Sequence, residues 1–188
     1  MGRYCYKMTN RGLTCRGYQF KENEVNVCDT ATCQQNGFHA ALNPLDCFSY
    51  YSSFQNNEFW LCYADGEVHE NLTDSKISCT ELTFVKRLEL WEVVAHACVY
   101  LIEHPKQEVS ERVSRDYGEA NGNGFAIVIG EHPRAKCMSE GDVLALIRID
   151  SEGHPLEYAI LMEDAVRPGC IYDLYGNEVE DHGRTDED

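Results

Sequence analysis

Cysteine and histidine side chains are the groups of this chain best suited to metal binding and to nucleophilic catalysis. The 188 residues include 10 cysteines and 7 histidines, and no two cysteines form a CxxC pair. Thiols scattered through apolar segments are typical of a reducing compartment, where free cysteine packs as a small apolar side chain. A zinc site made from Cys28, Cys33, His39 and Cys47 is the alternative, but structural zinc ligands usually pair about two to four residues apart. We therefore expect no metal.

No motif of a common catalytic site is present. The histidines form no HExxH pair, and neither GxxxxGK[ST] nor GxGxxG occurs. A nucleophilic cysteine–histidine pair stays open, because such partners meet only in the folded chain. The motifs alone favour no class of enzyme.

One helix and several strands must position these side chains. Apolar residues repeat at intervals of three and four from about Leu88 to His104, and Pro105 follows. This spacing predicts an amphipathic helix with Trp91 in the core. Aromatic and β-branched residues between turn residues predict strands at 4–8, 17–20, 58–63 and 77–85.

A short helix is predicted between these strands. Asn43 and Pro44 have the order of an N-cap and a first helical residue, and the helix would continue through Tyr51.

The composition changes after Pro105. Residues 106–124 are polar and end in a glycine cluster, which predicts a linker or a surface loop. Apolar runs follow, and turn sequences at 150–154 and 175–177 predict two hairpins. The runs lie at 125–129, 143–149 and 158–162.

Together these patterns predict an α+β fold, with a small mixed domain containing one long amphipathic helix, followed by a β-rich module. The mixed domain would span 1–105 and the acidic β-rich module 125–180, joined by the linker 106–124. Residues 181–188 are expected to form a disordered acidic tail.

The segment from Gly37 to Tyr51 reads GFHAALNPLDCFSYY. With Cys15-Arg16-Gly17 before it and Ser75-Lys76-Ile77 after it, the segment resembles an uncharacterised family of phage and prophage proteins. The resemblance extends over most of the chain, to an ending with Tyr172-Asp173-Leu174 and Gly176. It implies a mobile-element origin and carries no activity.

The same segment is distantly similar to ADP-ribosyltransferases of the diphtheria-toxin type. That resemblance implies NAD as the cofactor, with aromatic rings enclosing the nicotinamide. It also implies that Arg16 holds the cofactor and that Glu81 is the catalytic carboxylate. The cofactor-binding residues would be Gly37, Phe38, His39, Asn43, Tyr50 and Tyr51.

Two alternatives stand beside an active transferase. A relative can keep the fold without the chemistry. In the other, Gly37 is a turn glycine, Phe38 and Tyr50 belong to the core, and His39 is a hydrogen-bonded polar residue.

The chain is strongly acidic, with 32 Asp and Glu, 16 Lys and Arg, and a formal net charge of -16. This charge argues against nucleic acid and anionic membranes as direct partners. No apolar run is long enough to cross a bilayer, and the first residues lack the apolar segment of a secretory signal, so we expect a cytosolic protein. Residues 1–106 carry 13 acidic and 9 basic side chains, and residues 107–188 carry 19 and 7.

We therefore expect an acidic phage accessory protein that binds and inhibits a basic host nucleic-acid-handling protein. The partner would be a CRISPR nuclease or another defence factor, held by DNA mimicry as in anti-CRISPR inhibitors. The charge is also what solubility alone would produce, and strand edges of the second half could support a homodimer. The expected partner-binding residues are Glu108, Glu111, Asp116, Glu119, Glu131, Glu140 and Asp142.

Overall fold

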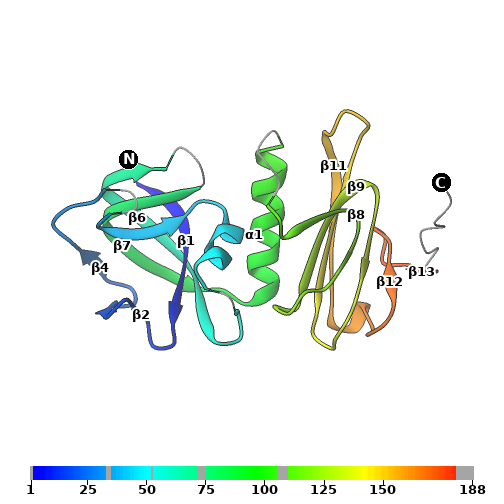
Figure 1. Ribbon diagram of the computed structural model, residues 1–188, viewed down its shortest axis with the longest axis horizontal. Coiled ribbons are helices and arrows are strands. Elements are labelled where there is room, and N and C mark those ends of the chain that lie inside the picture. Colours follow the sequence, from blue (N-terminus) through cyan, green and yellow to red (C-terminus); the bar gives the residue numbers. More distant parts are fainter. Residues whose placement is uncertain (1, 33–34, 52, 72–74, 106–109, 181–188) are drawn as a thin grey trace. The chain divides into compact units, whose positions relative to one another are not determined.

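The computed structural model describes residues 2–180 apart from 33–34, 52, 72–74 and 106–109 (Figure 1). It divides into two compact units, residues 1–97 and 98–188. Strands contain 51% of the described residues and helices 13%. The fold is therefore mostly β, and the expected α+β fold with one long amphipathic helix is wrong. Its one α-helix within the described residues has 14 residues, and most strands extend beyond the apolar runs that predicted them.

The strands of the first unit pair in a closed cycle. β1 pairs with β6, β6 with β7, β7 with β5, and β5 with β1, all antiparallel. The β2–β3 hairpin extends from β1, and β4 pairs with β7. The strands are β1 (Arg3–Asn10), β2 (Thr14–Cys15), β3 (Tyr18–Gln19), β4 (Val25–Val27), β5 (Phe38–Ala41), β6 (Asn57–Glu70) and β7 (Lys76–Arg87).

Several cysteines of the first unit belong to its apolar core. Cys5, Cys62 and Cys79 are fully buried among aromatic and aliphatic side chains, which include Phe84 and Leu82. Alternate residues of a strand face the same side, so these thiols lie on the inward faces of β1, β6 and β7. Burial raises the pKa of all three, and that of Cys79 to about 12. Their role is packing, as free thiols of this kind usually have.

The short helix predicted near Asn43 is confirmed as a 3-10 helix, η1 (Pro44–Ser49). The Asn43 side chain accepts a hydrogen bond from the Leu45 amide over 3.0 Å, and Pro44 occupies the first turn. An Asn cap satisfies an amide that the helix itself leaves without an acceptor.

The helix α1 (Leu90–Glu103) falls within the range expected from the sequence. Its buried side chains are Val93, Val94, Ala97 and Cys98. Trp91 is 45% exposed, so its expected place in the core is wrong. At about 3.6 residues per turn, Trp91 lies roughly a quarter turn from the middle of the buried stripe.

The second unit is a sheet built around β9. β8 and β10 run parallel to β9, whereas β12 runs antiparallel to it. The two predicted hairpins are confirmed as β10–β11 and β12–β13. The strands are β8 (Val113–Glu119), β9 (Phe125–Lys136), β10 (Val143–Ile149), β11 (Pro155–Met162), β12 (Ile171–Tyr172) and β13 (Glu178–Val179), and a 3-10 helix, η2 (Glu163–Ala165), follows β11.

Part of the segment expected to be a linker is a strand. β8 lies within residues 106–124 and pairs with β9 despite its polar sequence. Residues 106–109 and the expected tail 181–188 lie outside the described residues. Among the helices that are described, none combines the length and the apolar character needed to cross a membrane.

Candidate functional site

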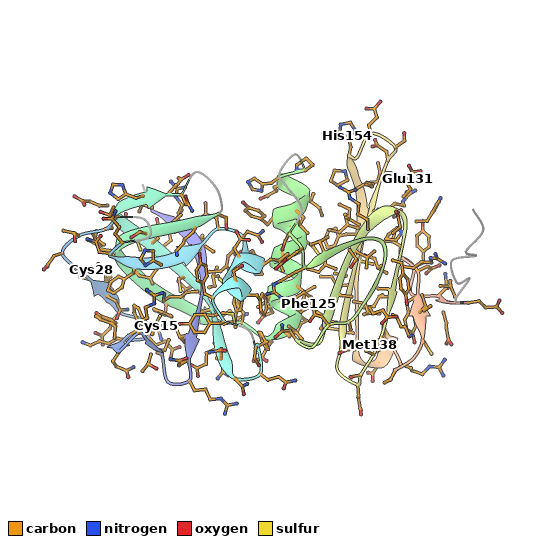
Figure 2. The ribbon with its side chains drawn as sticks, viewed as in Figure 1. Cys15, Cys28, Phe125, Glu131, Met138 and His154 are labelled. Atoms are coloured by element: carbon orange, nitrogen blue, oxygen red, sulfur yellow. The ribbon has the colours of Figure 1, made fainter. Side chains whose placement is uncertain are left out.

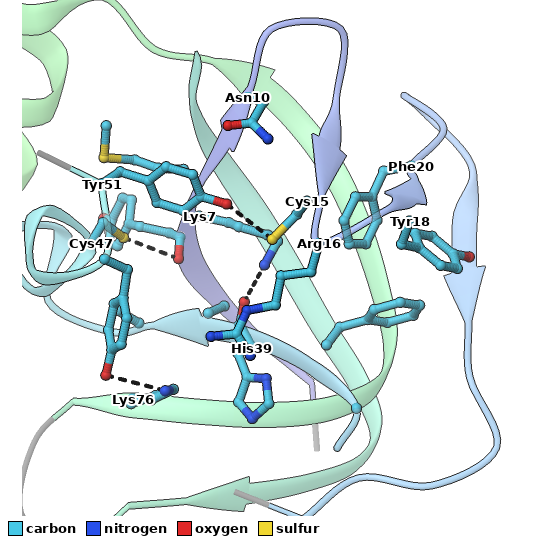
Figure 3. Close-up of a pocket in the computed structure, with 17 residues that line it drawn as sticks. Lys7, Asn10, Cys15, Arg16, Tyr18, Phe20, His39, Cys47, Tyr51 and Lys76 are labelled. Atoms are coloured by element: carbon cyan, nitrogen blue, oxygen red, sulfur yellow. Dashed lines mark hydrogen bonds between the residues drawn. The ribbon is translucent and has the colours of Figure 1, made fainter. Parts of the chain in front are cut away.

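A pocket of about 560 Å³ opens in the first unit (Figure 3). Its lining comes from β1, the β2–β3 hairpin, β5, the end of η1 and the first residue of β7. In the view of Figure 3, Tyr18 and Phe20 lie on one side and Tyr51 and Lys76 on the other, with Lys7, Arg16 and His39 between them. Its volume lies in the range of about 300–1,000 Å³ that is usual for small-molecule sites.

Lys7 is a buried cation of this pocket. It is 7% exposed, and its ammonium donates a hydrogen bond to the carbonyl oxygen of His39 over 2.6 Å. The ammonium also lies 5.4 Å from the centroid of the Phe20 ring. Among the described residues no carboxylate forms an ion pair with it. A buried charge without a counter-ion is unfavourable, so an anion bound beside this ammonium would be stabilising.

Two further cations line the pocket. Arg16 follows β2 with a left-handed backbone (φ 49°) and is exposed. Lys76 begins β7, donates a hydrogen bond to the Tyr50 hydroxyl over 3.1 Å, and lies over the Tyr50 ring at 4.2 Å. None of the described residues that line the pocket is Asp or Glu. The lining is therefore cationic in a chain that is acidic as a whole.

His39 reports this positive environment. Burial, followed by the charges of Lys76, Lys7 and Arg16, lowers its pKa from 6.5 to about 4. Its imidazole is therefore neutral at neutral pH. The Nε2 atom is buried and has no hydrogen-bond partner among the described residues. One interpretation of the sequence expected His39 to be a hydrogen-bonded polar residue, and its Nε2 atom does not fit that expectation.

Aromatic rings form a continuous wall on one side of the pocket. The ring centroid of Tyr18 lies 4.6 Å from that of Phe20 and 5.1 Å from that of Phe38. Phe38 is buried in the core, as one sequence interpretation expected, but Tyr50 is exposed. The Tyr51 hydroxyl donates to the Cys15 thiol over 3.0 Å, and burial is the main cause that raises the Tyr51 pKa.

The pocket brings together most of the residues predicted for a cofactor site. Arg16, Gly37, Phe38, His39, Tyr50 and Tyr51 line it. Asn43 and Glu81 are absent from the lining. Asn43 caps η1, and Glu81 lies within β7 opposite Val27 and Asp65. The carboxylate assigned to catalysis therefore lies outside the pocket.

The Asn-Pro-Leu-Asp segment has a structural role. Asp46 accepts hydrogen bonds from both the amide and the hydroxyl of Ser75, and the Ser75 hydroxyl accepts from the Asn43 amide over 2.8 Å. Leu45 is fully buried. The network fixes η1 to the residue just before β7, and so places Tyr50 beside Lys76.

Gly37 is required by packing as well as by its backbone. Its φ is 85°, and a Cβ atom there would lie 2.6 Å from the Ser78 hydroxyl oxygen and 2.9 Å from the Ala31 Cα. It is the glycine before β5 and lines the pocket. Close contact with the protein itself accounts for this glycine.

Sequence reasoning missed Lys7 and Lys76 as site residues, together with Cys15, Tyr18 and Phe20. A signal for Lys7 was available. Lys7 is two residues from both Cys5 and Thr9, so the three side chains share one face of β1, and Cys5 and Thr9 are buried. Fully buried lysines are rare unless they are paired, so this position was itself informative.

The residues expected to bind a partner differ in their availability. Glu111, Glu131 and Glu140 are exposed, and Figure 2 shows Glu131 at the rim of the second unit. Asp142 is 3% exposed and accepts hydrogen bonds from the amides of Met138 and Ser139.

The other expected contacts are constrained or fall outside the description. Glu119 is exposed and pairs with Lys136, and Asp116 has a left-handed backbone at a register shift between β8 and β9. Glu108 lies outside the described residues.

The described part of the chain has no group of three or more His, Cys, Asp or Glu side chains placed to hold a metal. Cys33, one of the possible zinc ligands, lies outside the described residues.

The fold and the site define the first unit as a closed sheet of antiparallel strands with a cationic pocket. Residues 4–96 match a family described as "Domain of unknown function (DUF7666)". The matched range includes every described residue that lines the pocket, from Tyr6 to Lys76. No curated protein and no solved structure matched the chain.

Proposed function

We propose that the first unit is a binding module for a small anion. The observation that supports this most directly is the buried ammonium of Lys7, which lines the pocket without a carboxylate partner among the described residues. Arg16 and Lys76 add positive charge, and no described acidic side chain of the lining competes for it. An anion in this pocket would supply the counter-charge that a buried cation requires.

Binding without group transfer is the form of this function that the lining favours. Transfer of ADP-ribose from NAD passes through a cationic sugar, which a nearby carboxylate must stabilise. Glu81, the candidate for that role, is outside the lining. The alternative proposal for this pocket is therefore that it binds NAD, as in an inactive relative of the transferases.

Calorimetric titration of the full chain with inorganic phosphate and inorganic pyrophosphate tests the proposal. We expect saturable binding that weakens with added salt, as binding between opposite charges does. Lys7→Met should reduce the affinity at least about tenfold, which corresponds to about 1.4 kcal/mol. The matched control is Lys21→Met, because Lys21 is exposed, pairs with Glu24 and does not line the pocket. Absence of saturable binding, or equal affinity in Lys7→Met, would overturn the proposal.

The second unit carries a separate candidate function, inhibition of a basic host protein. Exposed carboxylates at Glu111, Glu131 and Glu140 and the excess charge of residues 107–188 favour it. Such a surface accelerates encounter with a positive groove. This proposal includes a phage origin, from the resemblance, and a CRISPR nuclease as the partner. It also includes a cytosolic location, which is supported by the nine free cysteines among the described residues.

A purified CRISPR nuclease is the probe for this second function. The triple variant Glu111→Gln, Glu131→Gln and Glu140→Gln should weaken both binding and inhibition of DNA cleavage. Glu22→Gln with Glu24→Gln, two exposed changes in the first unit, is the control. Asp142 is left unchanged because its carboxylate holds a turn. Equal inhibition by the triple variant and the wild type would contradict the acidic-surface hypothesis.

A further inference from the structure

The size of the pocket is out of proportion to a simple inorganic anion. Its volume of about 560 Å³ could enclose a much larger molecule, and its lining is partly apolar. Drug-sized ligands fill such pockets mainly through apolar and aromatic contacts, while a few polar groups fix their orientation. The charge of the pocket therefore accounts for one part of a ligand, and the rest of the lining must be matched by another part.

The aromatic wall indicates what the uncharged part of the ligand is. Tyr18, Phe20 and Phe38 are in mutual ring contact, with centroids 4.6 to 5.1 Å apart. Phe20 and Phe38 are buried, whereas Tyr18 is 41% exposed, so the wall is anchored in the core and ends in an accessible ring. Planar ring systems stack on such side chains, at about 1–3 kcal/mol per nucleobase.

Two of the cations, Lys7 and Arg16, lie between this wall and the opposite side of the pocket, where the third cation, Lys76, lies with Tyr51 (Figure 3). Lys7 joins the two features directly, because its ammonium lies 5.4 Å from the Phe20 centroid. Phosphate is a better match than carboxylate to a site with three cations and no acidic side chain among its described lining residues, since phosphate carries up to two charges and several acceptor oxygens.

We infer that the ligand of this pocket is a free nucleoside monophosphate, with its phosphate held by Lys7, Arg16 and Lys76 and its base against Tyr18. This inference rests on the proposed anion-binding function and names the ligand class for that same site. A free nucleotide is favoured over the end of a nucleic acid strand because the chain has a net charge of -16, which repels a polyanion outside the pocket.

The test compares adenosine 5′-monophosphate, uridine 5′-monophosphate, ribose 5-phosphate and inorganic phosphate by calorimetry on the full chain. We expect one of the two nucleotides to bind at least about tenfold more tightly than ribose 5-phosphate, which is the gain that base stacking provides. A 5′-phosphorylated oligonucleotide should bind more weakly than the mononucleotide of the same base.

Tyr18→Leu should remove that gain and leave the affinity for ribose 5-phosphate unchanged. Tyr4→Leu is the matched control, because Tyr4 is 63% exposed, is an aromatic of the same unit and does not line the pocket. Tyr18→Phe should retain the gain, which separates stacking from loss of folding.

The outcomes distinguish this inference from the function on which it rests. If ribose 5-phosphate binds as tightly as both nucleotides, the base has no site and the inference fails, while the anion site stands. If the oligonucleotide binds more tightly than the mononucleotide, the free nucleotide is the wrong source. If none of the phosphates binds, the proposed function fails as well.

Discussion

The ammonium of Lys7 on β1 donates a hydrogen bond to the carbonyl oxygen of His39 on β5 over 2.6 Å. Since β1 and β5 pair in the sheet, this bond links two neighbouring strands from the side of the pocket. A single neutral acceptor satisfies only part of an ammonium with three donors. The buried ammonium of Lys7 therefore lowers the stability of the fold but favours the binding of an anion.

Replacement of Lys7 by Met should leave the free energy of unfolding unchanged or raise it by about 1–2 kcal/mol, because an apolar side chain of similar length removes a buried charge. Urea unfolding of the full chain measures this, with Lys21→Met as the control. A loss above about 1 kcal/mol would show that the bond to His39 outweighs the cost of burying the charge.

Gly37→Ala should destabilise the first unit by about 2 kcal/mol or more, since the new Cβ meets the Ala31 backbone and the backbone is left-handed. Gly12→Ala separates the two causes, because Gly12 has a φ of 75° with open space around it. Thermal unfolding should show a clearly larger loss at Gly37. Equal losses would mean that the contact with Ala31 is relieved without cost.

Removal of the Ser75 hydroxyl should cost about 1–3 kcal/mol, because Asp46 then loses a donor in a partly buried site. Asp46→Asn should have a similar effect, and the double variant should cost less than the sum of the two losses. Chemical denaturation of the four proteins completes the cycle. Asp29→Asn, a change at an exposed carboxylate, is the control, and strict additivity would show that the two residues are not coupled.

Lowering the pH from about 6.5 to about 4 should destabilise the first unit. His39 has a folded pKa of about 4, below its ordinary 6.5, so the unfolded chain binds a proton that the folded chain does not. The loss should be about 1–2 kcal/mol once the partial exposure of His39 is allowed for.

His39→Gln should reduce this pH dependence, whereas His69→Gln, a change at an exposed residue, should not. The remaining dependence should include His96, whose pKa is also lowered, mainly by burial. Denaturant midpoints measured at several pH values check this, and identical profiles for the wild type and His39→Gln would contradict it.

Local patterns predicted the individual elements better than the fold class. The Asn43–Pro44 cap and the two hairpins of the second unit follow from turn and capping preferences that act over a few residues. The closed pairing of β1, β5, β6 and β7 depends on contacts between distant segments, and the local spacing of apolar residues does not predict which strands pair. β8 was missed because its polar sequence is stabilised by pairing with β9.

The candidate site was predicted in part for a similar reason. Six residues singled out through the resemblance line the pocket, because most of them belong to one continuous segment. Lys7 and Lys76 join them through strand pairing across the sheet. Glu81 belongs to β7, as Lys76 does, but five residues further along, and it is not part of the lining. Sequence alone could not say which part of that strand reaches the pocket.

The cyclic pairing of the first unit also has a consequence during synthesis of the chain. Lys7 is made early, but the ring of strands that encloses it closes only when β7, ending at Arg87, has been translated. Until then β5 and β6 lack their common neighbour and expose unpaired backbone edges. A nascent chain that stops before Lys76 therefore has Lys7 without the strand that completes its site, and its unpaired strand edges favour aggregation over binding.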